Sequence, residues 1–158
     1  MRRRLVLGCA VLQFALVGAS FAQAVEEGPD AAEIARRVAA ICPTLPPASG
    51  LVWDYSRGPD FDLCYAVKAG SDETAFGVYF GTAPSFHPDK ANQVGSGQVA
   101  GRRVTWYRSS EEGKPSPFGR ETLVKFGSGG VSHVWVMASS QQQLDERLAT
   151  IGGMQFRR

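Results

Sequence analysis

The chain has 158 residues, and its 44% hydrophobic and 20% charged residues are typical of a single globular domain rather than a disordered or fibrous chain. Three of its 17 basic residues, Arg2, Arg3 and Arg4, lie at the extreme N-terminus. The other 14 stand against 15 acidic residues, so a strongly basic surface for nucleic acid is not expected.

The first 24 residues have the pattern of a secretory signal peptide. A short cationic start is followed by an apolar run at Leu5–Gly18, and Ala22-Gln23-Ala24 supplies the small residues of a signal-peptidase site. The run is shorter than the roughly 20 residues of a membrane-spanning helix. We therefore expect cleavage after Ala24 and a periplasmic or secreted protein with no membrane span after cleavage. The alternatives are a membrane anchor and lipidation at Cys9.

Cleavage at that point leaves two cysteines, Cys42 and Cys64. In an exported domain such a pair is most simply a structural disulfide. The alternatives are a redox pair and a metal site. Cys-x-x-Cys spacing is absent, and only His87 and His133 could assist in binding a soft metal. The sequence therefore predicts a disulfide, with no metal and no cofactor.

Along the chain, the hydrophobic periodicity predicts a helix, then strands, then a second helix. The first helix is expected to begin at Asp30, a capping residue, and to end near Cys42 because Pro43 cannot continue it. The second is expected to begin at Ser139 or Ser140 and to end at Gly152. A period of two predicts strands near Leu51–Tyr55, Phe61–Lys68, Thr74–Phe80, Val94–Val99, Arg103–Arg108, Arg120–Phe126 and Val131–Met137.

These elements predict one α+β domain over residues 25–158. We expect an antiparallel β-sheet of about six or seven strands, arranged as a meander, with an N-terminal and a C-terminal helix packed on it. Trp53, Trp106 and Trp135 come from three separate strands, and a shared core is the expected place for all three.

A long connection at Gly81–Asn92 is the first candidate binding segment. Phe86 could serve as an apolar contact, with His87 and Asp89 as polar or metal-binding groups. The alternative is a rigid surface loop in which Phe86 packs onto the sheet. One histidine and one aspartate are too few ligands to hold a metal by themselves.

The second candidate is the segment Ser109–Gly119. Glu111 and Glu112 give it a negative end, and Phe118 on a proline-stiffened hairpin tip could anchor a protein partner. The alternative is a solvated hairpin with Phe118 folded back onto the domain.

Two classes of function follow from this inventory. The first is an exported, non-catalytic binding protein with a protein partner in the cell envelope, of the inhibitor or immunity type. The second is a small hydrolase or metal-dependent enzyme that uses His87, Asp89 and His133. Ser132 and His133 cannot form a pair of nucleophile and general base, because neighbouring strand residues point to opposite faces. We expect His133 at a core edge, hydrogen-bonded to a neighbour.

Overall fold

The structure is a computed structural model that describes residues 30–111, 114–127 and 129–157. The expected signal peptide, residues 1–24, and Glu112 lie outside the described residues. The helices are α1 (Ala31–Ile41) and α2 (Gln141–Gly153), with short 3₁₀ turns at Pro47–Ser49 and Lys90–Asn92. The strands are β1 (Leu51–Arg57), β2 (Asp62–Lys68), β3 (Thr74–Gly81), β4 (Gln93–Val99), β5 (Arg102–Glu111), β6 (Lys114–Lys125) and β7 (Val131–Val136).

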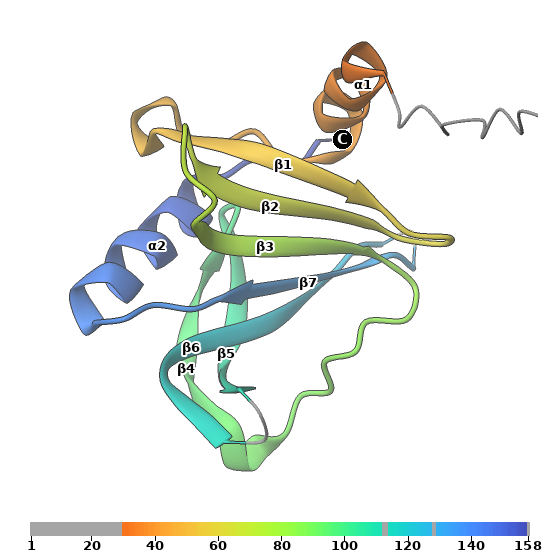
Figure 1. The fold of residues 1–158 in the computed structure, drawn as a ribbon. Coiled ribbons are helices and arrows are strands. Elements are labelled where there is room, and N and C mark those ends of the chain that lie inside the picture. The colour runs from red at the N-terminus through yellow and green to blue at the C-terminus, as the bar shows by residue number, and fades with distance from the viewer. Residues whose placement is uncertain (1–29, 112–113, 128, 158) are drawn as a thin grey trace, which may run out of the picture.

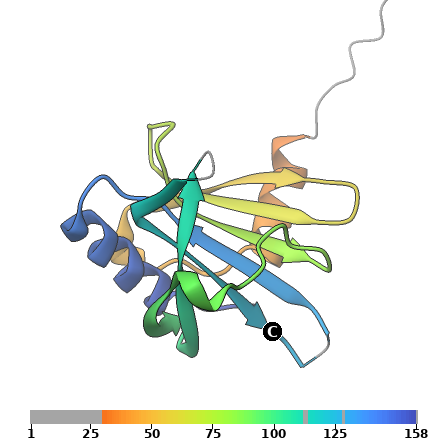
Figure 2. The same ribbon diagram turned by 90° about the horizontal axis from the view of Figure 1, so that it is seen from below.

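The strands form one antiparallel sheet in the order β1-β2-β3-β7-β6-β5-β4 (Figure 1). The α+β fold with seven strands and two helices is therefore confirmed. The expected simple meander is wrong, because the chain leaves β3 and crosses to the far edge of the sheet before it forms β4. The last four strands then return toward β3, which pairs with β7. The crossing is made by residues 82–92 (Figure 2).

Both helices begin where the sequence predicts. The Asp30 side chain accepts a hydrogen bond from the backbone N–H of Ala32, and the Ser140 hydroxyl accepts one from Gln143. Gln143 in turn accepts from the Ser139 N–H through its side-chain oxygen. These bonds occupy N–H groups that the first turn of a helix leaves free. The second helix ends later than expected, since it continues through Gly153 and is capped by Met154.

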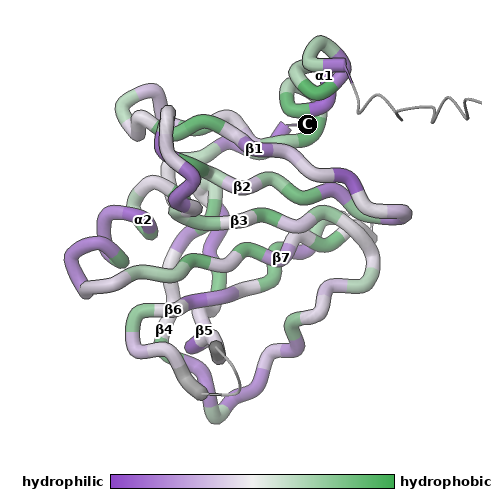
Figure 3. Tube along the Cα trace, in the orientation of Figure 1, coloured by the Kyte–Doolittle hydropathy of each residue, from purple (hydrophilic) through white to green (hydrophobic). Residues whose placement is uncertain are grey.

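The two helices cover one face of the sheet, and the core lies between them. Leu144 and Ile151 of α2 are fully buried there, against alternate residues of the strands such as Val78 and Val134. Hydrophobic residues recur along the central strands, whereas much of α2 is hydrophilic (Figure 3). We call the helix side the covered face and the opposite side the open face. Trp53 and Trp106 belong to the covered face.

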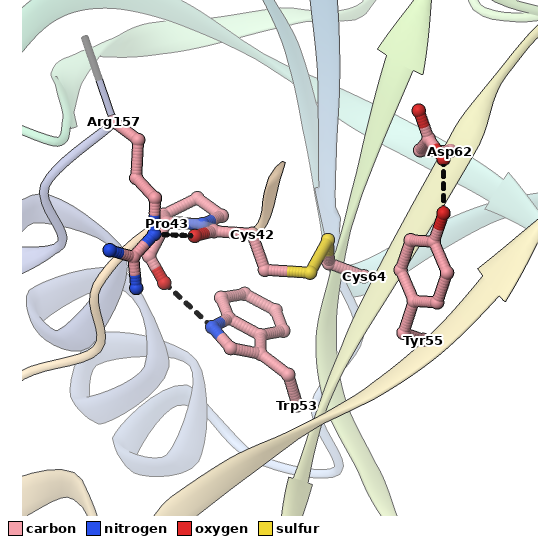
Figure 4. The surroundings of a disulfide bond; sticks show 7 residues. All are labelled: Cys42, Pro43, Trp53, Tyr55, Asp62, Cys64 and Arg157. Carbon is pink, nitrogen blue, oxygen red and sulfur yellow. Dashed lines mark hydrogen bonds between the residues drawn. A yellow bond between two sulfur atoms is a disulfide. The ribbon is translucent and has the colours of Figure 1, made fainter. Parts of the chain in front are cut away.

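The disulfide is confirmed: Cys42 at the end of α1 is bonded to Cys64 of β2, and both residues are fully buried (Figure 4). Around it, the Trp53 indole N–H donates to Pro43 O at 2.7 Å. Arg157 Nε donates to Cys42 O at 3.0 Å, so the C-terminal segment is held at the same point. The bond holds the end of α1 on the face of the sheet that carries Cys64.

The β4–β5 hairpin turns away from the plane of β1, β2, β3 and β7 (Figure 1). At its tip, Ala100 and Gly101 both have positive φ, as in the two-residue turns that suit hairpins. Their N–H groups donate to Ile151 O and Gly152 O, each at 3.0 Å. The tip is therefore tied to the last turn of α2 rather than to β6.

Among the described residues, the structure has no helix of the length and apolar character needed to cross a membrane.

Candidate functional site

The open face carries a row of aromatic rings that crosses several strands. We call Tyr65, Trp135, His133, Phe86 and Tyr107 the aromatic row. Neighbouring ring centroids are 5.9, 5.3, 5.2 and 5.6 Å apart in that order. These spacings lie within the range in which rings attract one another. The row thus joins β2, β7, the β3–β4 connection and β5 into one continuous surface.

Two glycines of β3 make space for this surface. Gly77 lies between Tyr65 of β2 and Trp135 of β7 in the sheet. The Trp135 indole lies over this glycine, and a Cβ atom there would come within 2.0 Å of the ring. A Cβ atom at Gly81 would come within 2.2 Å of the Tyr79 hydroxyl. That hydroxyl accepts a hydrogen bond from Ala83 N at 3.2 Å and so fixes the start of the β3–β4 connection.

A shallow pocket of about 300 Å³ lies beside the aromatic row. We call it the open-face pocket. Its lining combines apolar, aromatic and polar side chains from five strands and two connecting segments: Leu63, Tyr79, Ser85, Ser109, Ser110, Glu121, His133, Trp135 and Met137. Pockets with an apolar lining and a few convergent polar groups are the usual form of a binding site.

His133 and Glu121 are the titratable pair in this pocket. His133 Nε2 lies 3.1 Å from Glu121 Oε2, and their side chains are only 11% and 18% exposed. Phe86 stacks on the imidazole at an interplanar angle of 20°. The expected hydrogen-bonded histidine at a core edge is thus found, and its carboxylate partner is Glu121.

The β3–β4 connection follows the second of the two expectations made for it. Phe86 packs on the sheet between His133 and Tyr107 and does not form an exposed lip. His87 is exposed. Asp89 caps the turn at Lys90–Asn92 by accepting from Ala91 N at 3.0 Å.

The segment Ser109–Gly119 is mostly strand and not a loop, because β5 and β6 extend to Glu111 and Lys114. Phe118 is half-buried and packs against the core, so it follows the alternative in which it folds back onto the domain. It alternates in step with the buried Thr122 and Val124 along β6, which places its ring on the covered face. The backbone of Glu111 ends β5, and Glu112 is outside the described residues.

Comparison of the chain with protein-family models, with curated proteins and with solved structures finds no match. The geometry of the site therefore carries the functional argument.

Within the described part of the chain, no hydrogen bond or ion pair joins His87, Asp89 and His133, the residues of the enzymatic alternative. The Asp89 carboxylate serves as a cap, His87 is exposed, and His133 is paired with Glu121. No group of three or more His, Cys, Asp or Glu residues placed to hold a metal occurs among the described residues. Ser109 donates to the Met137 sulfur at 3.2 Å and not to His133.

Sequence reasoning missed the partners of His133. Trp135 lies on the open face, not in a core shared with Trp53 and Trp106, which is a correction to the expected single tryptophan core. Leu63 and Tyr65 lie on the same open face. The available signal was their position on the face of β2 opposite Cys64. The sequence shows that β2 has two apolar faces but does not show which one the helices cover.

Proposed function

We propose that the protein is an exported, non-catalytic binding protein that uses its open face to hold a protein partner in the cell envelope. The observation that carries the proposal is the aromatic row beside the open-face pocket. Trp, Tyr and Met are enriched at the centres of protein interfaces, because they bury a large area at a small entropic cost. Trp135, Tyr65 and Met137 supply this chemistry here.

The pocket fits one apolar or aromatic side chain of the partner rather than a large ligand. Its volume of about 300 Å³ is at the lower end of the range for ligand sites. Leu63 and Trp135 would contact the apolar part of that side chain. Glu121 would accept a hydrogen bond from a donor group of the partner next to it. Because Phe86 is already packed on His133, the surface is largely preformed, which lowers the ordering cost of binding.

Export is supported by the pattern of residues 1–24 and by the buried disulfide. Disulfides persist in oxidising compartments and are rare in the reducing cytosol. The Cys42–Cys64 bond ties α1 to the sheet and so belongs to the domain itself. The periplasm or the extracellular space is therefore the compartment that suits the fold.

Site-specific photo-crosslinking tests the proposal. Ser85 is exposed and lines the open-face pocket, whereas Ser71 is exposed on the turn between β2 and β3 and does not line it. A photoreactive phenylalanine analogue at each position, in the full chain exported by the source cells, should give one protein adduct from position 85 and none from position 71. Adducts only at position 71, or adducts of glycan instead of protein at position 85, would contradict it.

A further inference from the structure

The strands β5 and β6 separate at one end, although they are neighbours in the sheet. Their register ends at the pair Tyr107–Glu121. Beyond that pair, among the described residues, no residue of Arg102–Trp106 pairs through its backbone with a residue of Thr122–Lys125. One side-chain hydrogen bond spans the start of the gap, from Thr122 Oγ1 to Thr105 O at 2.7 Å. Each strand therefore presents an edge that lacks a strand partner.

The separation follows from where the hairpin tip is held. Ala100 and Gly101 bond to the end of α2, while β6 stays paired to β7 as far as Lys125. The two strands are thus attached to different neighbours beyond Tyr107. Between them lies a cleft of about 570 Å³. We call it the strand cleft.

The strand cleft has a lining of apolar and polar side chains and a basic rim. Leu123 is half-buried in this lining, whereas Val104 and Val124 are buried in the core behind it. Arg102, Arg103 and Lys125 are exposed at the rim. No carboxylate is among the lining residues.

The basic groups at the rim lack carboxylate partners. Elsewhere, Arg36 and Arg37 pair with Glu33, and Arg147 pairs with Glu73. Within the described part of the chain, none of the three rim cations forms an ion pair. A patch of one sign on a protein with nearly balanced charge attracts ligands of the opposite sign.

We propose that the strand cleft binds an extended acidic segment of a protein. The segment pairs through its backbone with the free edge of β5 or β6, its carboxylates meet Arg102, Arg103 and Lys125, and its apolar residues face Leu123. A free strand edge offers N–H and C=O groups alternately, and an extended polypeptide is the ligand that matches both. A phosphate or a nucleic acid would use the cations but leave the carbonyl groups of the strand edge without partners.

This interaction goes beyond the binding proposed for the open face, and the two sites adjoin at Tyr107, which lines the strand cleft and ends the aromatic row. The probe is a fluorescent, end-capped peptide of about eight residues that alternates Glu and Val, a length typical of one strand. Anisotropy measured with the full chain after export should show saturable binding that weakens as salt is added. A Lys-Val peptide of the same length should not bind.

Matched variants locate the site. Arg103→Gln combined with Lys125→Gln should weaken binding roughly tenfold, the effect of losing two exposed ion pairs. Arg57→Gln combined with Lys68→Gln removes the same charge from exposed positions on β1 and β2 and should leave the affinity unchanged. Trp135→Ala, on the open face, should also bind the peptide as the unmodified protein does.

Two further probes separate strand pairing from general attraction of anions. Two versions of the peptide carry N-methyl groups on alternate residues in the two possible registers. At least one should lose binding, because its methyl groups block the N–H groups that face the strand edge. Equal affinity of both methylated peptides and the unmodified one, displacement by inorganic phosphate at comparable concentration, or no binding of the Glu-Val peptide would overturn the proposal.

Discussion

The indole of Trp135 lies over Gly77, the residue directly opposite it on β3, where a Cβ atom would meet the ring at 2.0 Å. A glycine in the middle of a central strand weakens that strand, and here an aromatic ring from the next strand covers it. The pair therefore fixes both the position of Trp135 and the floor of the open face between Tyr65 and Trp135.

The first prediction concerns this close approach. Gly77→Ala forces the indole to move, so we expect a loss of about 1–3 kcal/mol in the free energy of unfolding, as for other overpacked sites. It should also shift the tryptophan emission. Gly127→Ala is the matched control, because nothing lies within 4 Å of its Cβ position. Denaturant unfolding that gives the two variants equal stability would show that Trp135 does not rest on Gly77.

The second prediction concerns the disulfide. Replacing both Cys42 and Cys64 with alanine should lower the free energy of unfolding by about 3 kcal/mol, the chain-entropy value for a loop of this size. The effect should be strongest at α1, which has no buried residue of its own and is held to the sheet at its end. Hydrogen exchange of α1 measures this. Two reactive thiols in the denatured, unreduced protein would contradict the bond itself.

Two buried hydroxyls on the covered face should behave in opposite ways. Ser132 Oγ is buried and has no hydrogen-bond partner among the described residues, so Ser132→Ala should leave the protein at least as stable as before. Thr122→Val removes the bond to Thr105 O at the start of the strand cleft and should cost about 1 kcal/mol. Equilibrium unfolding of both variants measures these stabilities. A Ser132→Ala variant less stable than Thr122→Val would contradict the hydrogen bonding described for the two hydroxyls.

The pH dependence of stability should report on Tyr55. Burial raises the pKa of its phenol, and its hydrogen bond to the Asp62 carboxylate raises it further. The unfolded chain therefore loses this proton at a lower pH than the folded protein does. Stability should fall as the pH rises above the ordinary tyrosine value of about 10. Tyr55→Phe should make that part of the slope disappear, and an unchanged slope would show that another group is responsible.

Local signals predicted most of the elements. The caps at Asp30 and Ser140, the proline after Cys42 and the period of two along the strands act within a few residues, and the structure agrees with them. The strand order was not predicted, because the length of the connection at Gly81–Asn92 does not say which edge of the sheet it reaches. Connections that cross a sheet depend on packing between distant segments.

The candidate site was predicted only in part. Phe86 and His133 were singled out, but their contact with each other depends on the path of the β3–β4 connection. Glu121 and Tyr65 were not predicted as site residues, because the alternation in β6 and β2 does not reveal which face the helices cover. Phe118 occupies the same phase of the alternation in β6 as the buried Thr122 and Val124, so it folds back onto the domain, the second of the two alternatives given for it.

The central claim is that the open face holds a protein partner, and affinity capture with matched variants tests it most directly. The full chain, exported and tagged, is compared with Trp135→Ala in the open-face pocket and with Val52→Ser. Val52 is 49% exposed on the edge strand β1 and lies outside the pocket. We predict one stoichiometric envelope protein, retained by the unmodified chain and by Val52→Ser and lost by a folded Trp135→Ala. Equal capture by all three proteins would contradict the claim.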